Sequence, residues 1–191
     1  MKREYADKLI SMYPEMFMMG DWRNKKPSVF HKLYNRVLLW LQLKYPYFKK
    51  FNHINESNPF RFGFECDDGW RGILAELILK IKELDSKTGE VTKVHQIKEK
   101  FGGLRFYPLN AASTDVWELI TEYEEKSYTV CEVTGSTVDV GVWTYGWIHT
   151  MSKEYAKEYF NRLKGENRIA NGLQLEDCWK YSEDITNMKL K

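Results

Sequence analysis

Side chains that could bind a phosphorylated, planar ligand gather in the stretch QIKEKFGGLRFY, residues 96–107. Lys98 and Lys100 precede its glycine pair, and Arg105 and Tyr107 follow it. Side chains alternate between the two faces of a strand, so Arg105 and Tyr107 share a face that the lysines approach from the partner strand. Cations beside an aromatic ring suit a phosphate that is joined to a base or a ribose.

The glycine pair, Gly102 and Gly103, predicts the tight turn of a hairpin and lets backbone N–H groups approach an anion. His95 and Gln96, on the first strand of that hairpin, could face the same ligand. The alternative is that the glycines only form the turn and that the charged residues form a solvated face of a sheet.

A second candidate segment, DDGW at residues 67–70, directly precedes a predicted helix. In the functional interpretation, Asp68 accepts hydrogen bonds from ribose hydroxyls while Trp70 stacks on a base. In the structural alternative, the aspartates stabilise the N-terminus of the helix. Trp147 supplies a further ring that could face the ligand.

The sequence contains no motif of a hydrolase or a nucleotide-cleaving enzyme. It lacks Gly-x-Ser-x-Gly, a Cys–His signature and a phosphate loop with Gly-Lys-Ser/Thr. Its histidines are isolated from one another in the sequence; they are His31, His53, His95 and His149. A general base needs a partner and a positioned substrate, so we expect a binding protein without catalytic residues.

Three stretches taken together carry a resemblance: FECDDGW at 64–70, QIKEKFGGLRFY at 96–107 and CEVTG at 131–135. With Gly146, Trp147 and Thr150 following, residues 61–156 resemble a widespread family of small phage and prophage proteins of undescribed function. The resemblance implies a viral protein that acts in the cytoplasm of a bacterial host cell.

The same family carries a small zinc ribbon, Cys-x-x-Cys followed by Cys-x-x-His. Over that pattern Cys131 keeps the first ligand position, while Thr134, Ser152 and Tyr155 occupy the other three. Hydroxyl groups are not structural zinc ligands, so the resemblance implies a degenerate ribbon at 129–156 with no metal and no cofactor. Packing must then hold this segment, and the candidates are Val138, Val140, Trp143 and Trp147.

Composition narrows the function classes further. The 191 residues include 29 basic and 27 acidic side chains, a net charge of +2, so we expect no binding to duplex nucleic acid. No stretch is apolar and long enough to span a membrane, and no secretory signal is visible. The three cysteines, Cys66, Cys131 and Cys178, are therefore expected to be reduced thiols in the cytoplasm.

Hydrophobic periodicity predicts an α+β domain in which amphipathic helices pack on a small antiparallel sheet. Helices are expected near 2–13, from 27 to about 45, over 73–84, after a cap at Ser113, Thr114 or Asp115, and after Ser152; a hairpin is expected at 92–107 and short strands within 129–150. We expect one domain over 1–165, in which 21–60 form a helical insertion relative to the family, and a C-terminal tail at 166–191.

The leading functional hypothesis is that the protein sequesters a small nucleotide-type immune signal of the host without cleaving it. The first alternative is a protein-binding module that inhibits a host enzyme by covering its surface, because aromatic residues such as Trp22 and Phe51 favour interfaces. The second is a degenerate nucleic-acid-binding ribbon. A host protein and a second copy of the chain are therefore further candidate partners.

Overall fold

The computed structural model describes residues 1–17, 60, 63–109 and 113–181. Apart from Phe60, the predicted helical insertion at 21–60 lies outside these described residues, as does the end of the predicted tail. The described helices are α1 (Arg3–Met12), α2 (Pro14–Phe17), α4 (Arg71–Thr88), α5 (Thr114–Lys126), α6 (Lys153–Gly165) and α7 (Leu175–Cys178), with 3-10 turns η3 (Asp68–Trp70) and η4 (Ser127–Thr129). The strands are β1 (Phe64–Glu65), β2 (Val94–Lys100), β3 (Gly103–Pro108), β4 (Val140–Trp143), β5 (His149–Ser152) and β6 (Trp179–Tyr181).

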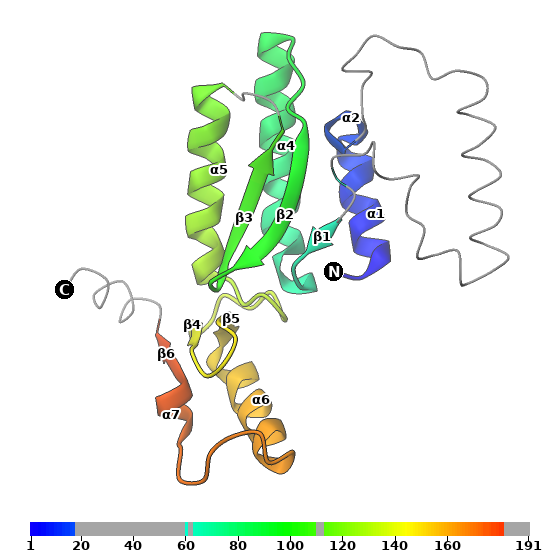
Figure 1. Ribbon diagram of the computed structural model, residues 1–191. Helices are drawn as coiled ribbons and strands as arrows, with labels where there is room; N and C mark the ends of the chain where they lie inside the picture. The colour runs from blue at the N-terminus through cyan, green and yellow to red at the C-terminus, as the bar shows by residue number, and fades with distance from the viewer. Residues whose placement is uncertain (18–59, 61–62, 110–112, 182–191) are drawn as a thin grey trace, which may run out of the picture.

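The fold is α+β, as the sequence predicts, but its strands form two small sheets (Figure 1). The first has the order β1-β2-β3, and the second has the order β5-β4-β6. The expectation of one antiparallel sheet needs correction, because β1 pairs with β2 in parallel, with Phe64 opposite Ile97. The predicted hairpin is present as β2 and β3, with Ile97 opposite Phe106 and Lys98 opposite Arg105.

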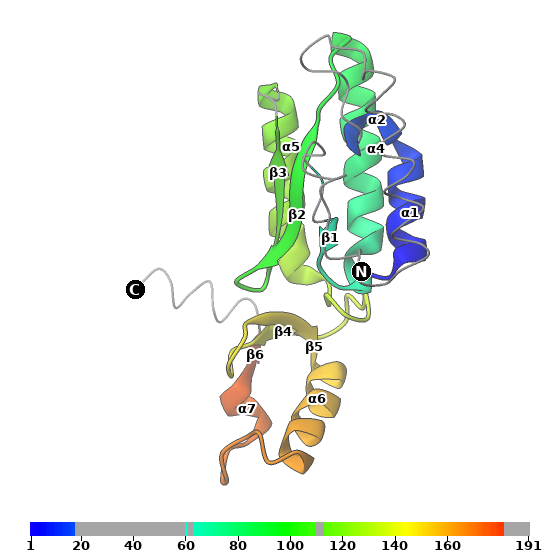
Figure 2. The same cartoon turned by 45° about the vertical axis from the view of Figure 1, so that its right-hand side comes forward.

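The described residues up to Val130 form the N-terminal lobe, and they contribute the larger of the two hydrophobic cores. Helices α4 and α5 lie on one face of the first sheet, and α1 packs beside α4 (Figures 1 and 2). Helix α4 buries one apolar stripe, Ile73, Leu74, Leu77, Ile78 and Ile81, at the predicted helical spacing. It ends at Gly89, whose φ of 75° is the left-handed conformation that glycine adopts at low cost.

Residues 131–181 form a second, smaller core, the core of the C-terminal lobe. Helix α6 begins where Ser152 caps it, and the Ser152 hydroxyl accepts a hydrogen bond from the Tyr155 N–H at 3.3 Å. Residues 166–181, separated as a tail in the sequence analysis, belong to this lobe. Trp179 is buried in the core, and β6 pairs with β4 along Gly141–Trp143.

Two of the packing residues expected for the C-terminal lobe do not serve that role. Trp143 is fully buried and Val140 is half-buried, whereas Val138 and Trp147 are exposed. Trp179 and Met151 supply the buried apolar surface instead. The expectation was wrong because the chain reverses between β4 and β5, and this connection turns Trp147 away from the core.

The two lobes are joined by hydrogen bonds around the segment that connects them. The Gly69 N–H donates to the Glu132 carbonyl at 2.7 Å, and the Asp67 N–H donates to the Glu132 carboxylate at 3.2 Å. Within the N-terminal lobe, the Trp70 indole Nε1 donates to the carbonyl of Val130, at the end of that lobe, at 2.9 Å. A Cβ at Gly69 would lie 2.2 Å from the Cys131 carbonyl oxygen, so glycine is required for this close approach. The lobes therefore meet through the predicted DDGW segment.

Candidate functional site

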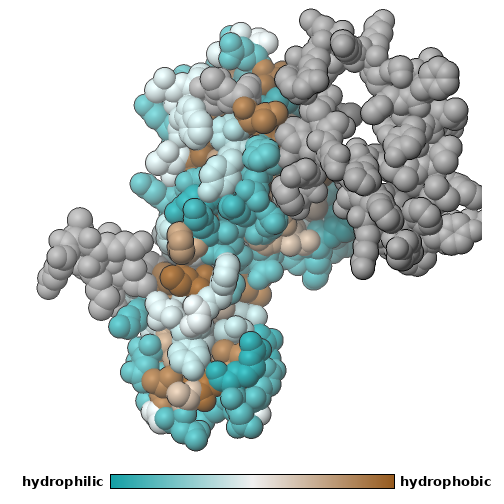
Figure 3. All heavy atoms as spheres, viewed as in Figure 1, coloured by the Kyte–Doolittle hydropathy of each residue, from teal (hydrophilic) through white to brown (hydrophobic). Residues whose placement is uncertain are grey.

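A groove of about 550 Å³ lies at the junction of the lobes, where the β2–β3 turn meets the β4–β5 connection. We call it the waist groove, and its lining residues are Glu65, Lys98, Glu99, Lys100, Phe101, Gly146, Trp147 and Ile148. Hydrophobic surface is visible at this junction, beside the polar surface of both lobes (Figure 3). The volume lies within the range of about 300–1,000 Å³ that is common for small-molecule sites.

Two exposed aromatic rings line the waist groove. Phe101 is 65% exposed and Trp147 is 69% exposed, although large rings are usually buried. Phe101 also has a φ of 55°, a left-handed conformation that costs a residue other than glycine about 1–2 kcal/mol. The turn therefore presents an aromatic ring to solvent from a strained backbone, a combination typical of binding sites.

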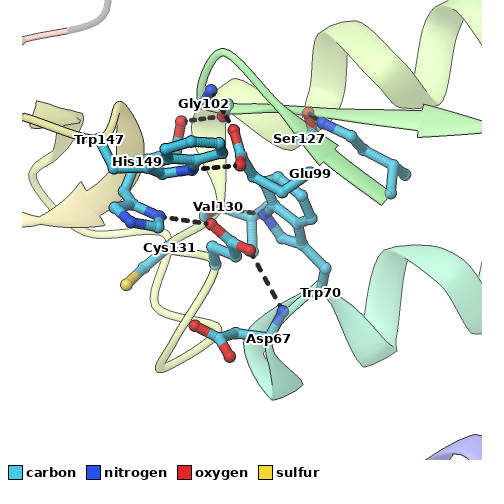
Figure 4. Close-up of polar contacts among 12 residues, drawn as sticks. Asp67, Trp70, Glu99, Gly102, Ser127, Val130, Cys131, Trp147 and His149 are labelled. Carbon is cyan, nitrogen blue, oxygen red and sulfur yellow. Dashed lines mark hydrogen bonds and ion pairs between the residues drawn. The ribbon is translucent and has the colours of Figure 1, made fainter. Parts of the chain in front are cut away.

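The carboxylate of Glu99 connects the turn to Trp147. One oxygen accepts a hydrogen bond from the Gly102 N–H at 2.6 Å, and the other accepts one from the Trp147 indole Nε1 at 2.8 Å (Figure 4). The ring of Trp147 is thus oriented while most of its surface stays free. Both Glu99 oxygens are occupied by N–H donors, which reduces repulsion between this carboxylate and an anionic ligand.

The cations of the waist groove are Lys98 and Lys100. Within the described part of the chain neither lysine forms an ion pair. Their ammonium groups lie over aromatic rings instead: Lys98 Nζ is 5.4 Å from the ring centroid of Tyr107, and Lys100 Nζ is 5.5 Å from that of Phe101. A cation over a ring is held weakly, so both lysines are available to a phosphate.

The structure brings part of the predicted site together. Lys98, Lys100 and Trp147 line the waist groove, and Tyr107 lies next to it under Lys98. Gln96 is adjacent as well, because its side-chain amide donates a hydrogen bond to the groove residue Glu65.

Trp70 and Asp68 do not belong to the groove, which corrects the prediction for both residues. Trp70 is fully buried in the N-terminal lobe and cannot stack on a ligand. Asp68 faces the start of the chain, where its carboxylate accepts a hydrogen bond from the Lys2 N–H at 2.6 Å. The interaction of Asp68 is therefore with the beginning of α1.

Arg105 shares a sheet face with Lys98 in register, but its guanidinium does not reach the groove. It donates to the Leu104 carbonyl at 2.6 Å and to the Tyr128 hydroxyl at 3.3 Å, and it lies 3.8 Å from the Glu124 carboxylate. The prediction that Arg105 binds the anion together with the lysines is thus corrected. Its neighbours Leu104 and Phe106 are buried as expected.

The glycine pair serves the turn and the lobe junction. Gly102 has a φ of 78°, its N–H donates to Glu99, and its carbonyl accepts a hydrogen bond from the Thr150 hydroxyl. A Cβ at Gly103 would lie 2.4 Å from the Tyr128 hydroxyl oxygen. The expectation that these glycines leave N–H groups free for an anion is corrected for Gly102.

His95 lies at an irregularity of β2 and is exposed. The register shifts between Val94 and Gln96, so that Val94 and Ile97 are both buried, which strict alternation does not allow. His95 does not line the waist groove.

Sequence reasoning missed several groove residues, among them Phe101, Glu99 and Ile148. A signal existed for Phe101, because an aromatic residue directly before Gly-Gly falls at the tip of the predicted turn. Glu99 and Ile148 had no signal of their own, since their place depends on how the two lobes meet.

A buried carboxylate lies next to the groove, at the lobe junction. Glu132 accepts a hydrogen bond from the Asp67 N–H at 3.2 Å, and its other oxygen lies 3.2 Å from His149 Nδ1 (Figure 4). Burial acts to lower the pKa of His149, but the hydrogen bond and the charge of Glu132 outweigh it, so the pKa is raised above its usual value. Protonated His149 therefore strengthens the junction.

Cys131, at the first ligand position of the segment predicted to be a degenerate ribbon, begins a tight turn. The Thr134 N–H points at the Cys131 sulfur, 3.4 Å away, and the Gly135 N–H donates to the Cys131 carbonyl at 2.9 Å. In the described residues no group of three or more His, Cys, Asp or Glu side chains gathers as a metal site. That the purified protein holds no zinc stays a prediction, which elemental analysis checks.

Comparisons with known proteins give no relative for this chain: no family model, no curated protein and no solved structure matches it. Among the described helices, none has the length and apolar character needed to cross a membrane.

Proposed function

We propose that the protein binds a small nucleotide-type ligand in the waist groove and holds it without cleaving it. The observation that carries this proposal is the pair of exposed rings, Phe101 and Trp147, on a groove that also holds two lysines with no ion pair to any other described residue. Rings stack on a base, and the ammonium groups of Lys98 and Lys100 neutralise phosphate.

The lining of the groove supports binding over hydrolysis. Among the described residues that line it, none is a histidine, serine, cysteine or aspartate, so this lining offers no Ser–His or Cys–His pair. The biological role that fits is sequestration: a phage-encoded protein in the host cytoplasm that removes an immune signalling nucleotide. This role depends on the sequence resemblance, and the groove supplies the chemistry for it.

A panel of linear and cyclic nucleotides tests the proposal. Each compound is screened by the shift it causes in the melting temperature, and bound compounds are released by heating and analysed by mass spectrometry. We expect at least one nucleotide to stabilise the protein and to be recovered intact. Recovery of a cleaved product would contradict sequestration, and no shift across the panel would contradict the proposal as a whole.

Matched variants connect any binding to the groove. Trp147→Leu and the double change Lys98→Gln/Lys100→Gln should each weaken binding at least roughly 10-fold, because stacking and charge-assisted contacts are each worth about 1–3 kcal/mol. The controls are Trp117→Leu, an exposed tryptophan on α5, and Lys157→Gln, an exposed lysine on α6. Neither control lines the groove, and neither should change binding.

A second candidate function is inhibition of a host protein through the same surface. The exposure of Phe101 and Trp147 favours it, since exposed aromatic residues anchor many interfaces. Capture from host lysate of one stoichiometric protein, lost on Trp147→Leu, would favour this function if no nucleotide binds. A salt-dependent gel shift would favour the third candidate, nucleic-acid binding by the degenerate ribbon.

A further inference from the structure

We propose that the ligand carries two planar rings joined through phosphate, with one ring in the waist groove and the second on Tyr107. This inference rests on the proposed function and specifies its ligand class as a dinucleotide, either linear or cyclic. The inference is based on the position of Lys98, which contacts both the groove and Tyr107. Lys98 lines the groove, and its Nζ lies 5.4 Å from the ring centroid of Tyr107.

Tyr107 and the β2–β3 turn, which carries the groove residue Phe101, lie at two ends of one sheet face. In the hairpin register Tyr107 is opposite Gln96, and Gly103 is opposite Lys100 at the turn. Four residues of strand separate these two pairs, which corresponds to roughly 13 Å. A single nucleotide places its base on one aromatic platform only, whereas two nucleosides bridged by phosphate reach both.

The charges along this face favour an anion in the middle. Lys98 lies between the two platforms, and it leaves the ring of Tyr107 when it pairs with a phosphate, because phosphate is the stronger partner. Arg105 is opposite Lys98 in register, but its guanidinium already contacts Glu124 and Tyr128. Lys98 is therefore the cation that binds phosphate at this position.

Polar acceptors flank the same position. Glu65 is paired in register with Lys98 across the parallel strands, and it accepts a hydrogen bond from the Gln96 amide. Its carboxylate has room for a second donor, which suits a ribose hydroxyl or an exocyclic amine next to the phosphate. The face therefore offers the ring of Tyr107, and next to it the carboxylate of Glu65 and the ammonium group of Lys98, which both line the groove that holds the other rings. A dinucleotide requires groups of these kinds.

Calorimetric titration with matched probes tests the inference. AMP and GMP are compared with linear and cyclic dinucleotides of the same bases, using the full chain. We expect the best dinucleotide to bind roughly 10- to 100-fold more tightly than its mononucleotide, the gain that one further stacked base gives. Tyr107→Leu should remove most of that gain, and Tyr107→Phe, which keeps the ring, should preserve it.

Each outcome has a distinct meaning. If mononucleotides and dinucleotides bind equally and Tyr107→Leu changes neither, the two-ring ligand is wrong while the proposed function stands. If no probe binds, the proposed function fails and this inference fails with it. Melting curves of both Tyr107 variants and of the Trp117→Leu control show whether a loss of affinity comes from the missing ring or from unfolding. If Tyr107→Leu does not fold, the comparison of mononucleotides with dinucleotides in the unmodified protein tests the inference.

Discussion

The indole Nε1 of Trp147 donates a hydrogen bond to the Glu99 carboxylate, 2.8 Å away, and so joins the C-terminal lobe to the hairpin of the N-terminal lobe. The two residues are 48 positions apart in the chain. Their contact orients an exposed ring at the groove without burying it. The proposed ligand site thus depends on how the lobes meet, as well as on the hairpin itself.

Replacing Glu99 tests this orientation directly. Glu99→Ala removes the acceptor for Trp147 and for the Gly102 N–H, so we expect stability to fall by about 1–2 kcal/mol and nucleotide affinity to fall roughly 5- to 30-fold. Glu99→Gln keeps one acceptor oxygen and should give an intermediate result. Titration and melting curves measure both effects; full affinity in Glu99→Ala would mean that the orientation of Trp147 is unimportant.

Arg105→Ala should affect stability more than binding. It removes the hydrogen bond to Tyr128 and the ion pair with Glu124, both partly shielded from solvent, and should destabilise the protein by about 1–2 kcal/mol. Ligand affinity should stay within about twofold, because Arg105 does not line the groove and its guanidinium is engaged with Tyr128 and Glu124. A large loss of ligand affinity with an unchanged melting temperature would show that Arg105 does contact the ligand. For comparison, Phe106→Ala removes a buried core side chain and should lower the free energy of unfolding by about 3–5 kcal/mol.

Asp85 is a buried acceptor that should be essential to the N-terminal lobe. Its carboxylate accepts hydrogen bonds from the Tyr13 hydroxyl at 2.8 Å and from the N–H and hydroxyl of Thr92 at 2.7 and 2.8 Å. Asp85→Asn should cost about 2–4 kcal/mol, since an amide cannot accept at both ends. Tyr13→Phe, which removes one donor, should cost less. Equal stability of Asp85→Asn and wild type in urea would show that this network is dispensable.

The junction should weaken as the pH rises. The pKa of His149 is raised in the folded protein by its hydrogen bond to Glu132, against the effect of burial. Its contribution to stability is therefore complete below about pH 6.5, the ordinary pKa, and is lost as the pH rises through the folded-state pKa. We expect the stability difference between wild type and His149→Gln to be larger at about pH 5.5 than at about pH 8.5, by on the order of 1 kcal/mol. A difference that grows with pH would contradict this assignment.

Local patterns were sufficient to predict helix α4 and the β2–β3 hairpin of the N-terminal lobe. The apolar stripe of α4 and the Gly102-Gly103 turn each follow from residue types within one element, so spacing alone is sufficient to place them. The pairing of β6 with β4 had no such signal, because β4 and β5, which Trp179 contacts, lie more than 25 residues earlier in the chain.

Two Gly-Trp pairs show why the site itself was harder to predict. At Gly69 a Cβ would collide with the Cys131 carbonyl, and Trp70 lies fully buried beneath the junction. At Gly146 a Cβ would meet nothing within 4 Å, and Trp147 stays exposed. The dipeptide is the same, and only the tertiary environment decides which tryptophan is available to a ligand.

The most direct test of the proposed function is the nucleotide affinity of Trp147→Leu compared with wild type and with Trp117→Leu. It is measured by calorimetry with the tightest binder from the nucleotide panel, after melting curves have established that all three proteins are folded. Binding through the waist groove predicts a loss of at least roughly 10-fold for Trp147→Leu and no change for Trp117→Leu. Equal affinity in all three proteins would contradict the assignment of the waist groove as the ligand site.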